Sequence, residues 1–168
     1  MAVEEQVLSN FYHPIDIALF TSLGQRLTIP NRRVTTLGFW LMRVQVGAIW
    51  GDVFFEINRV SDDSLIVSKE WGRLADVPSG FATYLEVTFD TPALINEEVR
   101  IYVRPTGATA TNYIGVNLQD TDVKAGEVCC RHRVFGDAWE VLVGYDCAYR
   151  YSYQAAPTVQ TDPATEVS

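Results

Sequence analysis

The side chains in this chain that could act as acids or bases in hydrolysis are mainly aspartates, and most of them fall in segments typical of turns. Glycoside cleavage needs two carboxylates held in a cleft, and the candidates are Asp62, Asp63, Asp120, Asp122, Asp137 and Asp146. Aspartate is favoured in turns because its side chain hydrogen-bonds the local backbone. The first five are therefore interpreted as turn formers. Asp146 is instead expected to be a charge partnered by Arg150 near the end of the last strand.

Nucleophilic catalysis would need a cysteine or serine beside a histidine. The chain has two histidines, His13 and His132, and His132 shares an expected strand face with Cys130. No glycine-rich turn leads into a helix, as a phosphate-binding loop would require, so we expect a protein that is not an enzyme. No C-x-x-C or H-x-x-x-H spacing supports zinc, and the oxygen-rich turn at 120–122 leaves calcium open as an alternative. The sequence thus predicts no catalytic residue, no cofactor and no metal.

Aromatic residues are the remaining candidates for binding. Two loop tryptophans and four tyrosines that are expected to face outward make up the set Trp50, Trp71, Tyr102, Tyr113, Tyr151 and Tyr153. Exposed aromatic faces beside Asn, Asp and Arg stack on sugar rings, and protein interfaces are rich in the same residue types. Both uses stay open, as does simple burial of the loop tryptophans. Trp40 and Trp139 are expected to lie in the core.

The composition is that of one globular domain. Of the 168 residues, 48% are hydrophobic and 20% are charged, and a chain of this length buries a sizeable core without metal or disulfide support. The net charge of -8 disfavours nucleic acid as a partner, and the basic pieces Arg32-Arg33 and Arg131-His-Arg133 are interpreted as solvated. The acidic N-terminus has no signal-peptide pattern, and no apolar run reaches the roughly 20 residues of a membrane span. We expect synthesis in the cytoplasm and no membrane insertion.

Three cysteines, Cys129, Cys130 and Cys147, are too few and odd in number for a secreted disulfide scaffold. They are interpreted as buried, reduced thiols on strands. A bridge from Cys147 to Cys129 or to Cys130 would need their strands to lie side by side, and the sequence does not decide between these states.

Short apolar or alternating runs are separated by Gly, Pro, Asn and Asp every ~8–12 residues, which is typical of an antiparallel sandwich or barrel. The last strand shows the pattern most clearly, because Cys147, Tyr149, Tyr151 and Tyr153 occupy alternate positions. No helical stretch separates the strands, so a parallel βαβ arrangement is not expected. We predict an all-β fold, an antiparallel two-sheet β-sandwich of the jelly-roll type with about eight to ten strands.

Both ends of the chain are expected to lie outside this domain. Residues 1–16 are polar and contain His13-Pro14, which favours an extended backbone, so they are predicted to form an N-terminal arm. The β-sandwich domain is placed at residues 17–154, with Pro30-Asn31 and Asp90-Thr-Pro92 interrupting its strands. Residues 155–168 are rich in Pro, Thr and Ala without a period, which predicts a C-terminal tail without its own core.

Eight stretches carry a resemblance when taken in order: Leu19–Thr28, Gly38–Arg43, Gly51–Ile57, Tyr84–Pro92, Val99–Val103, Asn112–Val116, Trp139 and Tyr145–Tyr151. Together they resemble a family of non-catalytic, carbohydrate-binding-like jelly-roll modules found in phage decoration and tail proteins and in bacterial surface proteins. In such modules a Gly-Asp-Val strand, a Phe-Asp-Thr-Pro corner and a terminal Tyr-Asp-x-Ala-Tyr-Arg strand recur in this order. The resemblance covers residues 17–153 and departs at Cys129-Cys130. It implies a fold and a class of protein but no ligand, because such folds host many functions.

The resemblance implies first a non-enzymatic phage virion structural protein, namely an exterior capsid decoration protein whose arms contact neighbouring subunits. Its partners would be other virion proteins and further copies of itself in a homo-oligomer, and its location would be the virion. The alternative is a carbohydrate-binding module of a tail fibre or surface-adhesion protein. A host glycan would then lie in a groove lined by Trp50, Trp71 and nearby tyrosines.

Overall fold

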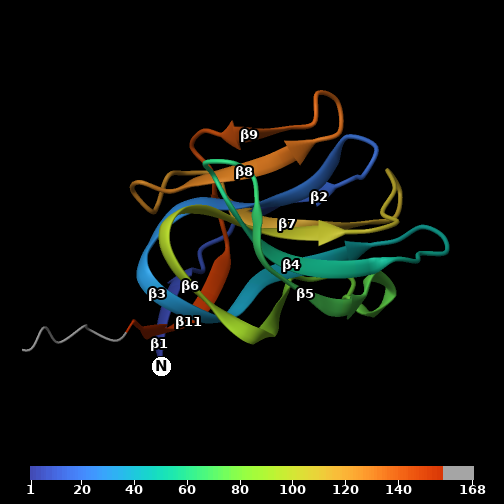
Figure 1. Cartoon of the computed structure of the whole chain (residues 1–168). Coiled ribbons are helices and arrows are strands. Elements are labelled where there is room, and N and C mark those ends of the chain that lie inside the picture. Colours follow the sequence, from blue (N-terminus) through green and yellow to red (C-terminus); the bar gives the residue numbers. More distant parts are fainter. Residues whose placement is uncertain (157–168) are drawn as a thin grey trace, which may run out of the picture.

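The computed structural model describes residues 1–156, and nearly all of its regular structure is strand (Figure 1). Eleven strands and one short 3-10 helix follow one another: β1 (Ala2–Gln6), β2 (Phe11–Ile15), β3 (Phe20–Val44), β4 (Asp52–Arg59), β5 (Leu65–Arg73), η1 (Leu74–Asp76), β6 (Thr83–Pro105), β7 (Tyr113–Gln119), β8 (Val128–Arg133), β9 (Ala138–Leu142), β10 (Asp146–Cys147) and β11 (Tyr149–Ala155). The described residues contain no helix long and apolar enough to cross a membrane. The predicted all-β, antiparallel, sandwich-like fold is confirmed.

Two strands are much longer than the sequence predicted, because bulges stand where strand ends were expected. β3 continues through Pro30-Asn31, where its register against β6 shifts and Asn31 has a φ of 45°. Proline has no N–H for the ladder and a bulge absorbs the extra residues, so the strand bends without stopping. β6 likewise continues through Asp90-Thr-Pro92. Both strands curve round the left-hand side of the molecule in Figure 1.

These two bent strands belong to both layers of the sandwich. The first half of β3 and the second half of β6 lie in a layer with the order β5-β4-β6-β3-β8-β9. Their other halves pair with each other and continue into a second layer, where β3 also pairs with β11 and β7. Buried side chains fill the space between, among them Phe39 and Phe55, whose rings meet edge-on with centroids 5.6 Å apart. Burying one such ring stabilises the fold by about 1.5–3 kcal/mol.

Residues 1–16 do not form an arm separate from the domain. β1 pairs along its whole length with β11, and β2 pairs with β7. Ion pairs from Glu4 to Lys124 and from Glu5 to Arg150, each 2.5 Å long, hold β1 in place. The extended backbone predicted around His13-Pro14 is present, but it belongs to the sheet. A polar edge strand resembles an arm in sequence because its charged side chains face water while its backbone pairs.

The alternation predicted for the last strand is only partly present, because Asp146, Ala148 and Ser152 on the other face are buried as well. Cys147, Tyr149 and Tyr151 are fully buried, Tyr153 is half-buried, and Arg150 between them reaches the surface. The predicted C-terminal tail, residues 155–168, lies outside the described residues from position 157 onward. Ala155 is the last residue of β11.

Candidate functional site

A groove of about 360 Å³ crosses the outer face of the β5-β4-β6-β3-β8-β9 layer. Its lining consists of Thr21, Ser22, Glu56, Asn58, Asp63, Tyr102, Arg104, His132, Asp137 and Trp139. Ligand sites typically combine aromatic surface with a small number of polar groups that fix orientation. We refer to this hollow as the central groove.

Strand alternation and register bring the lining together. Glu56 on β4 lies opposite Tyr102 on β6, which in turn lies opposite Gly24 on β3, and Gly24 lies opposite Cys130 on β8. Residues two positions along a strand share its face, which adds further members of the lining. Intervening residues such as Phe55 point the other way, into the core. A shift of one residue in strand register would therefore turn the groove side chains into the core and the core side chains outward.

Trp139 forms the aromatic wall of the central groove. Its ring centroid lies 5.0 Å from that of Tyr102 and 5.2 Å from that of His132, both edge-on, and the Arg100 guanidinium carbon is 5.0 Å from the same centroid. The prediction that Trp139 lies in the core is wrong, because β9 pairs only with β8 among the described strands and leaves the indole half-buried. Trp40 is half-buried too, with its ring against Tyr84.

The floor of the groove holds a neutralised carboxylate. Arg104 grips Glu56 with two hydrogen bonds of 2.9 and 2.7 Å, and the Ser68 hydroxyl donates a third of 2.8 Å. Burial alone would raise the pKa of Glu56, but these donors and the Arg104 charge hold that pKa below its usual value. Burial and the Glu56 charge raise the pKa of Tyr102. Glu56 is thus ionised at neutral pH, and its charge is already matched.

Asn58 is the one groove residue whose buried polar atom lacks a partner within residues 1–156. The side chain is 4% exposed, and its Oδ1 accepts no hydrogen bond from the described chain. Buried amide oxygens are nearly always satisfied, and an unsatisfied one costs about 1–3 kcal/mol. Asn58 therefore has hydrogen-bonding capacity that the folded chain does not use.

His132 is fixed against the Trp139 wall by contacts at both ring nitrogens. The Thr21 hydroxyl lies 3.0 Å from Nδ1, and the Asp137 carboxylate lies 3.5 Å from Nε2. The order of groups resembles a nucleophile, base and acid, yet the Asp137 side chain is 95% exposed. Water screens such a charge, so the Asp137 contact adds little. The contacts orient the imidazole ring beside Trp139.

The sequence-predicted aromatic candidates do not come together. Tyr102 alone lines the central groove, and it is 7% exposed. Tyr151 is fully buried, so the prediction that it faces outward is wrong: β11 turns this side chain into the core, and Arg32 Nη1 donates a 2.6 Å hydrogen bond to its hydroxyl. Trp71, Tyr113 and Tyr153 are partly buried against the core.

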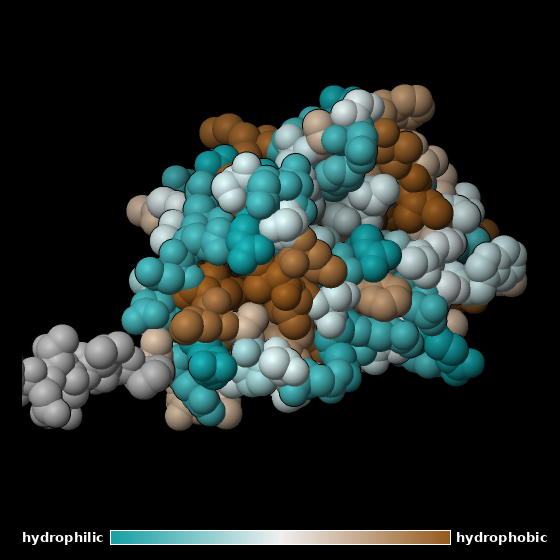
Figure 2. Space-filling model, viewed as in Figure 1, coloured by the Kyte–Doolittle hydropathy of each residue, from teal (hydrophilic) through white to brown (hydrophobic). Residues whose placement is uncertain are grey.

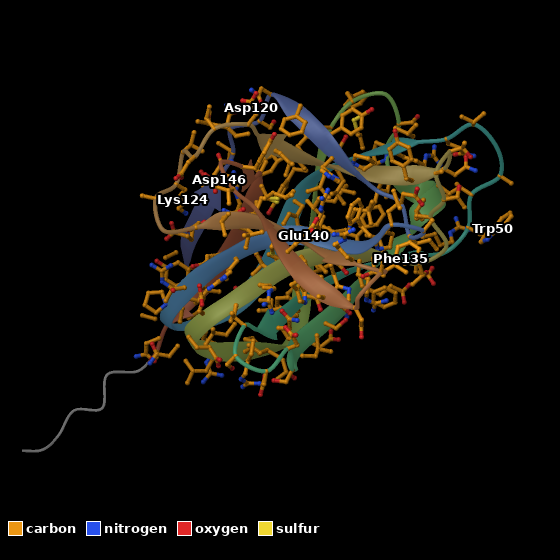
Figure 3. The ribbon with its side chains drawn as sticks, turned by 90° about the horizontal axis from the view of Figure 1, so that it is seen from above. Trp50, Asp120, Lys124, Phe135, Glu140 and Asp146 are labelled. Atoms are coloured by element: carbon orange, nitrogen blue, oxygen red, sulfur yellow. The ribbon has the colours of Figure 1, made fainter. Side chains whose placement is uncertain are left out.

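Trp50 is the exposed member of the predicted set. Its side chain is 69% exposed, and Figure 3 shows it on a loop at the right-hand end of the molecule, well away from the body of the sheet. It takes no part in the central groove. The predicted loop position of Trp50 is correct, since it lies between β3 and β4. The sequence around Trp50 does not indicate which other residues lie near it.

The aspartates divide into turn formers and one structural acceptor. Asp62 forms the predicted turn, since its Oδ1 accepts hydrogen bonds from the backbone N–H and the hydroxyl of Ser64. Asp146 is not the partner of Arg150. It is fully buried and accepts hydrogen bonds from Gln25 Nε2 at 2.6 Å and from the N–H groups of Val123 and Lys124 at 2.8 and 2.9 Å. Figure 3 shows Asp146 beside Lys124.

The cysteines and acidic turns give no metal centre in residues 1–156, where no three or more His, Cys, Asp or Glu side chains gather as ligands would. Cys130 shares a face with His132, as predicted, but it is buried. Burial raises the pKa of the Cys130 thiol well above its usual value. A thiol in this state is a poor nucleophile.

Neither a scan against protein-family models nor a search of the curated proteins finds a match for this chain. A function is therefore inferred from the geometry of the central groove and from the exposed surface.

Proposed function

We propose that this protein is a non-enzymatic binding module that holds a neutral carbohydrate in the central groove. The observation that carries the proposal is that a half-buried Trp139 ring lines the same groove as an Asn58 amide with unused hydrogen-bonding capacity. The C–H face of a sugar stacks on an indole ring. Asn58 Oδ1 is enclosed in the folded chain, so a turn of this side chain toward the groove would be needed for a sugar hydroxyl to donate to it. The ligand would satisfy a group that folding leaves unsatisfied.

The charges of the groove support a neutral ligand. Arg104 neutralises Glu56, and Arg100 pairs with Asp63 at the other side of the lining. An anionic or cationic ligand would have to compete with these existing pairs. The lowered pKa of Glu56 also makes it a poor general acid, which favours binding over cleavage of a glycosidic bond.

The test is a glycan array followed by calorimetric titration of the best neutral sugar. Trp139→Ala should weaken binding about tenfold, since an aromatic contact contributes about 1–1.5 kcal/mol, and Asn58→Ala should weaken it by a similar factor. Trp50→Ala is the matched control, because this tryptophan is exposed and lies outside the groove. Equal loss in Trp50→Ala and Trp139→Ala, or an array without any bound glycan, would contradict the proposal.

We propose as a second candidate that the chain is a phage virion structural protein, with head decoration as the simplest role. The observation that favours it is a set of exposed apolar side chains, Val46, Trp50 and Phe81. Val46 and Trp50 belong to the loop between β3 and β4, and residues around Val46 line one hollow with Ser79 and Gly80, next to Phe81 in the chain. Exposed apolar surface is typical of protein interfaces. The face shown in Figure 2 also carries apolar patches among hydrophilic residues.

Light scattering on the purified protein tests this second candidate. The wild type should be an oligomer or bind phage particles, and a variant with Trp50→Ser and Phe81→Ser should be a monomer with the same unfolding temperature. Deleting residues 1–16 would not be a clean test, because it removes two paired strands of the domain. A monomeric wild type with no affinity for particles would overturn the candidate.

A further inference from the structure

Two of the three cysteines meet in the interior of the sandwich. The sulfur atoms of Cys129 and Cys147 lie 3.3 Å apart, and both side chains are fully buried. Cys129 belongs to β8, which pairs with the first half of β3, whereas Cys147 belongs to β10, which pairs with β7 in the other layer. We propose that these two thiols form an intramolecular disulfide that joins the two layers.

The strand geometry selects Cys129 and not its neighbour. Successive side chains of a strand point to opposite faces, so Cys129 faces the core while Cys130 lies on the face of the central groove. Cys129 is opposite Gln25, whose Oε1 accepts a 2.9 Å hydrogen bond from the N–H of Cys147. Cys130 is opposite Gly24 on the groove face. For Cys130 to reach Cys147, β8 would have to turn over.

Hydrogen bonds already hold the backbone segments that carry Cys129 and Cys147 close together. The Cys129 N–H donates a 2.8 Å hydrogen bond to the Tyr145 carbonyl, two residues before Cys147. The side chain of Gln25 spans the gap, since it also donates to Asp146. A disulfide brings its sulfur atoms to about 2.05 Å, and we expect side-chain rotation to supply the remaining movement from the present 3.3 Å.

The chemistry is a thiol–disulfide exchange with a small-molecule disulfide such as oxidised glutathione. One cysteine thiolate attacks the disulfide, forms a mixed disulfide and releases one small thiol; the second cysteine thiolate then displaces the other small thiol. The two protons lost by the cysteines end on the two released thiols, so the protein is oxidised by two electrons and the reagent reduced by two. Burial raises the pKa of Cys147, so the exchange belongs to the folding chain, before the interior closes.

The bridge would close a covalent loop around the segment that contains Trp139, the aromatic wall of the central groove. The chain between the two cysteines contains β9 with Trp139, and the covalent loop spans a sequence separation of 18 residues. Closing a loop of about this length restricts the unfolded chain enough to raise the midpoint of thermal unfolding by roughly 6–12 °C in a domain of this size. The same bridge would limit opening of the β8–β9 hairpin.

The test uses the full chain, refolded in a mixture of reduced and oxidised glutathione. We expect one free thiol per denatured chain, a mass about 2 Da below that of the reduced chain, and a cross-linked peptide joining Cys129 to Cys147. Cys130→Ser should keep the bridge and leave no free thiol. Adding a thiol reductant should lower the unfolding midpoint of wild type by the amount given above, and should not lower that of Cys129→Ser.

Two results would overturn the proposal. Three free thiols in refolded wild type would show that Cys129 and Cys147 stay reduced in a glutathione mixture that should oxidise them. A cross-linked peptide that contains Cys130 would show that a different pair forms. If Cys129→Ser does not fold, the thiol count and peptide map of wild type and of Cys130→Ser still decide the question.

Discussion

Replacing Asp146 by alanine should destabilise the fold by roughly 4 kcal/mol. Its carboxylate accepts three hydrogen bonds from donors that are buried or partly buried: Gln25 Nε2 and the N–H groups of Val123 and Lys124. A buried donor left unpaired costs about 1–3 kcal/mol. We take about 2 kcal/mol for the enclosed Gln25 amide and about 1 kcal/mol for each loop N–H, which water can reach after truncation. The sum is a large part of the 5–15 kcal/mol typical of a domain.

Urea unfolding followed by tryptophan fluorescence measures this loss. Asp146→Asn keeps one acceptor oxygen and should lose about half as much as Asp146→Ala. Asp122→Ala is the control, because this exposed aspartate belongs to the same turn region and should change stability by less than about 0.5 kcal/mol. A loss below about 1 kcal/mol in Asp146→Ala, with an unchanged denaturant slope, would refute the assignment of Asp146 as the acceptor that secures this turn.

Three further predictions concern the groove and the edge of the sheet. Gly24→Ala should lower the thermal midpoint strongly and weaken glycan binding, because a Cβ there would stand 1.9 Å from the Ile101 carbonyl oxygen and 2.5 Å from Tyr102 Cα; calorimetry checks both effects. The pKa of Glu56 is lowered by folding, so its contribution to stability is full above its ordinary pKa of 4.5 and is lost as the pH falls below it. Glu56→Gln should therefore flatten the acid side of the stability profile in urea titrations, relative to wild type. Deleting residues 2–6 should destabilise the fold and raise hydrogen exchange in β11, because β1 is paired along that strand; unchanged exchange would show that β1 is dispensable.

The sequence predicts the fold class well because the evidence for it is local. Alternating runs and frequent turn residues depend only on neighbouring positions, and the structure confirms the all-β fold that they predict. The two-sided burial of β11 is not visible in the sequence, since Ala148 and Ser152 are buried along with the tyrosines. The expected strand ends at Pro30 and Pro92 fail for a physical reason: a bulge lets a strand carry a proline through a bend. The predicted N-terminal arm fails because pairing with β11 is a contact between opposite ends of the chain, and edge strands tolerate charge.

The candidate site is harder to predict because it depends on register between distant strands. The groove combines Trp139 from β9, Asn58 from β4 and His132 from β8. These strands are separate in the sequence, so no short motif contains all three residues. The one local signal is the alternation of Glu56 and Asn58 with the buried Phe55 and Ile57, which marks their face as outward. The same alternation predicts an outward position for Tyr102. The partners that surround it follow only from the pairing of β3, β6 and β8.

The measurement that tests the central claim most directly is an NMR titration of the four indole N–H signals with a panel of neutral mono- and oligosaccharides. Assignment by single Trp→Phe variants identifies the signal of each tryptophan. A glycan held in the central groove should shift the Trp139 signal in a saturable way, leave the Trp50 signal unchanged, and lose this effect in Asn58→Ala. A panel that leaves Trp139 unperturbed, or that shifts only the Trp50 signal, would contradict the assignment of the groove as the binding site.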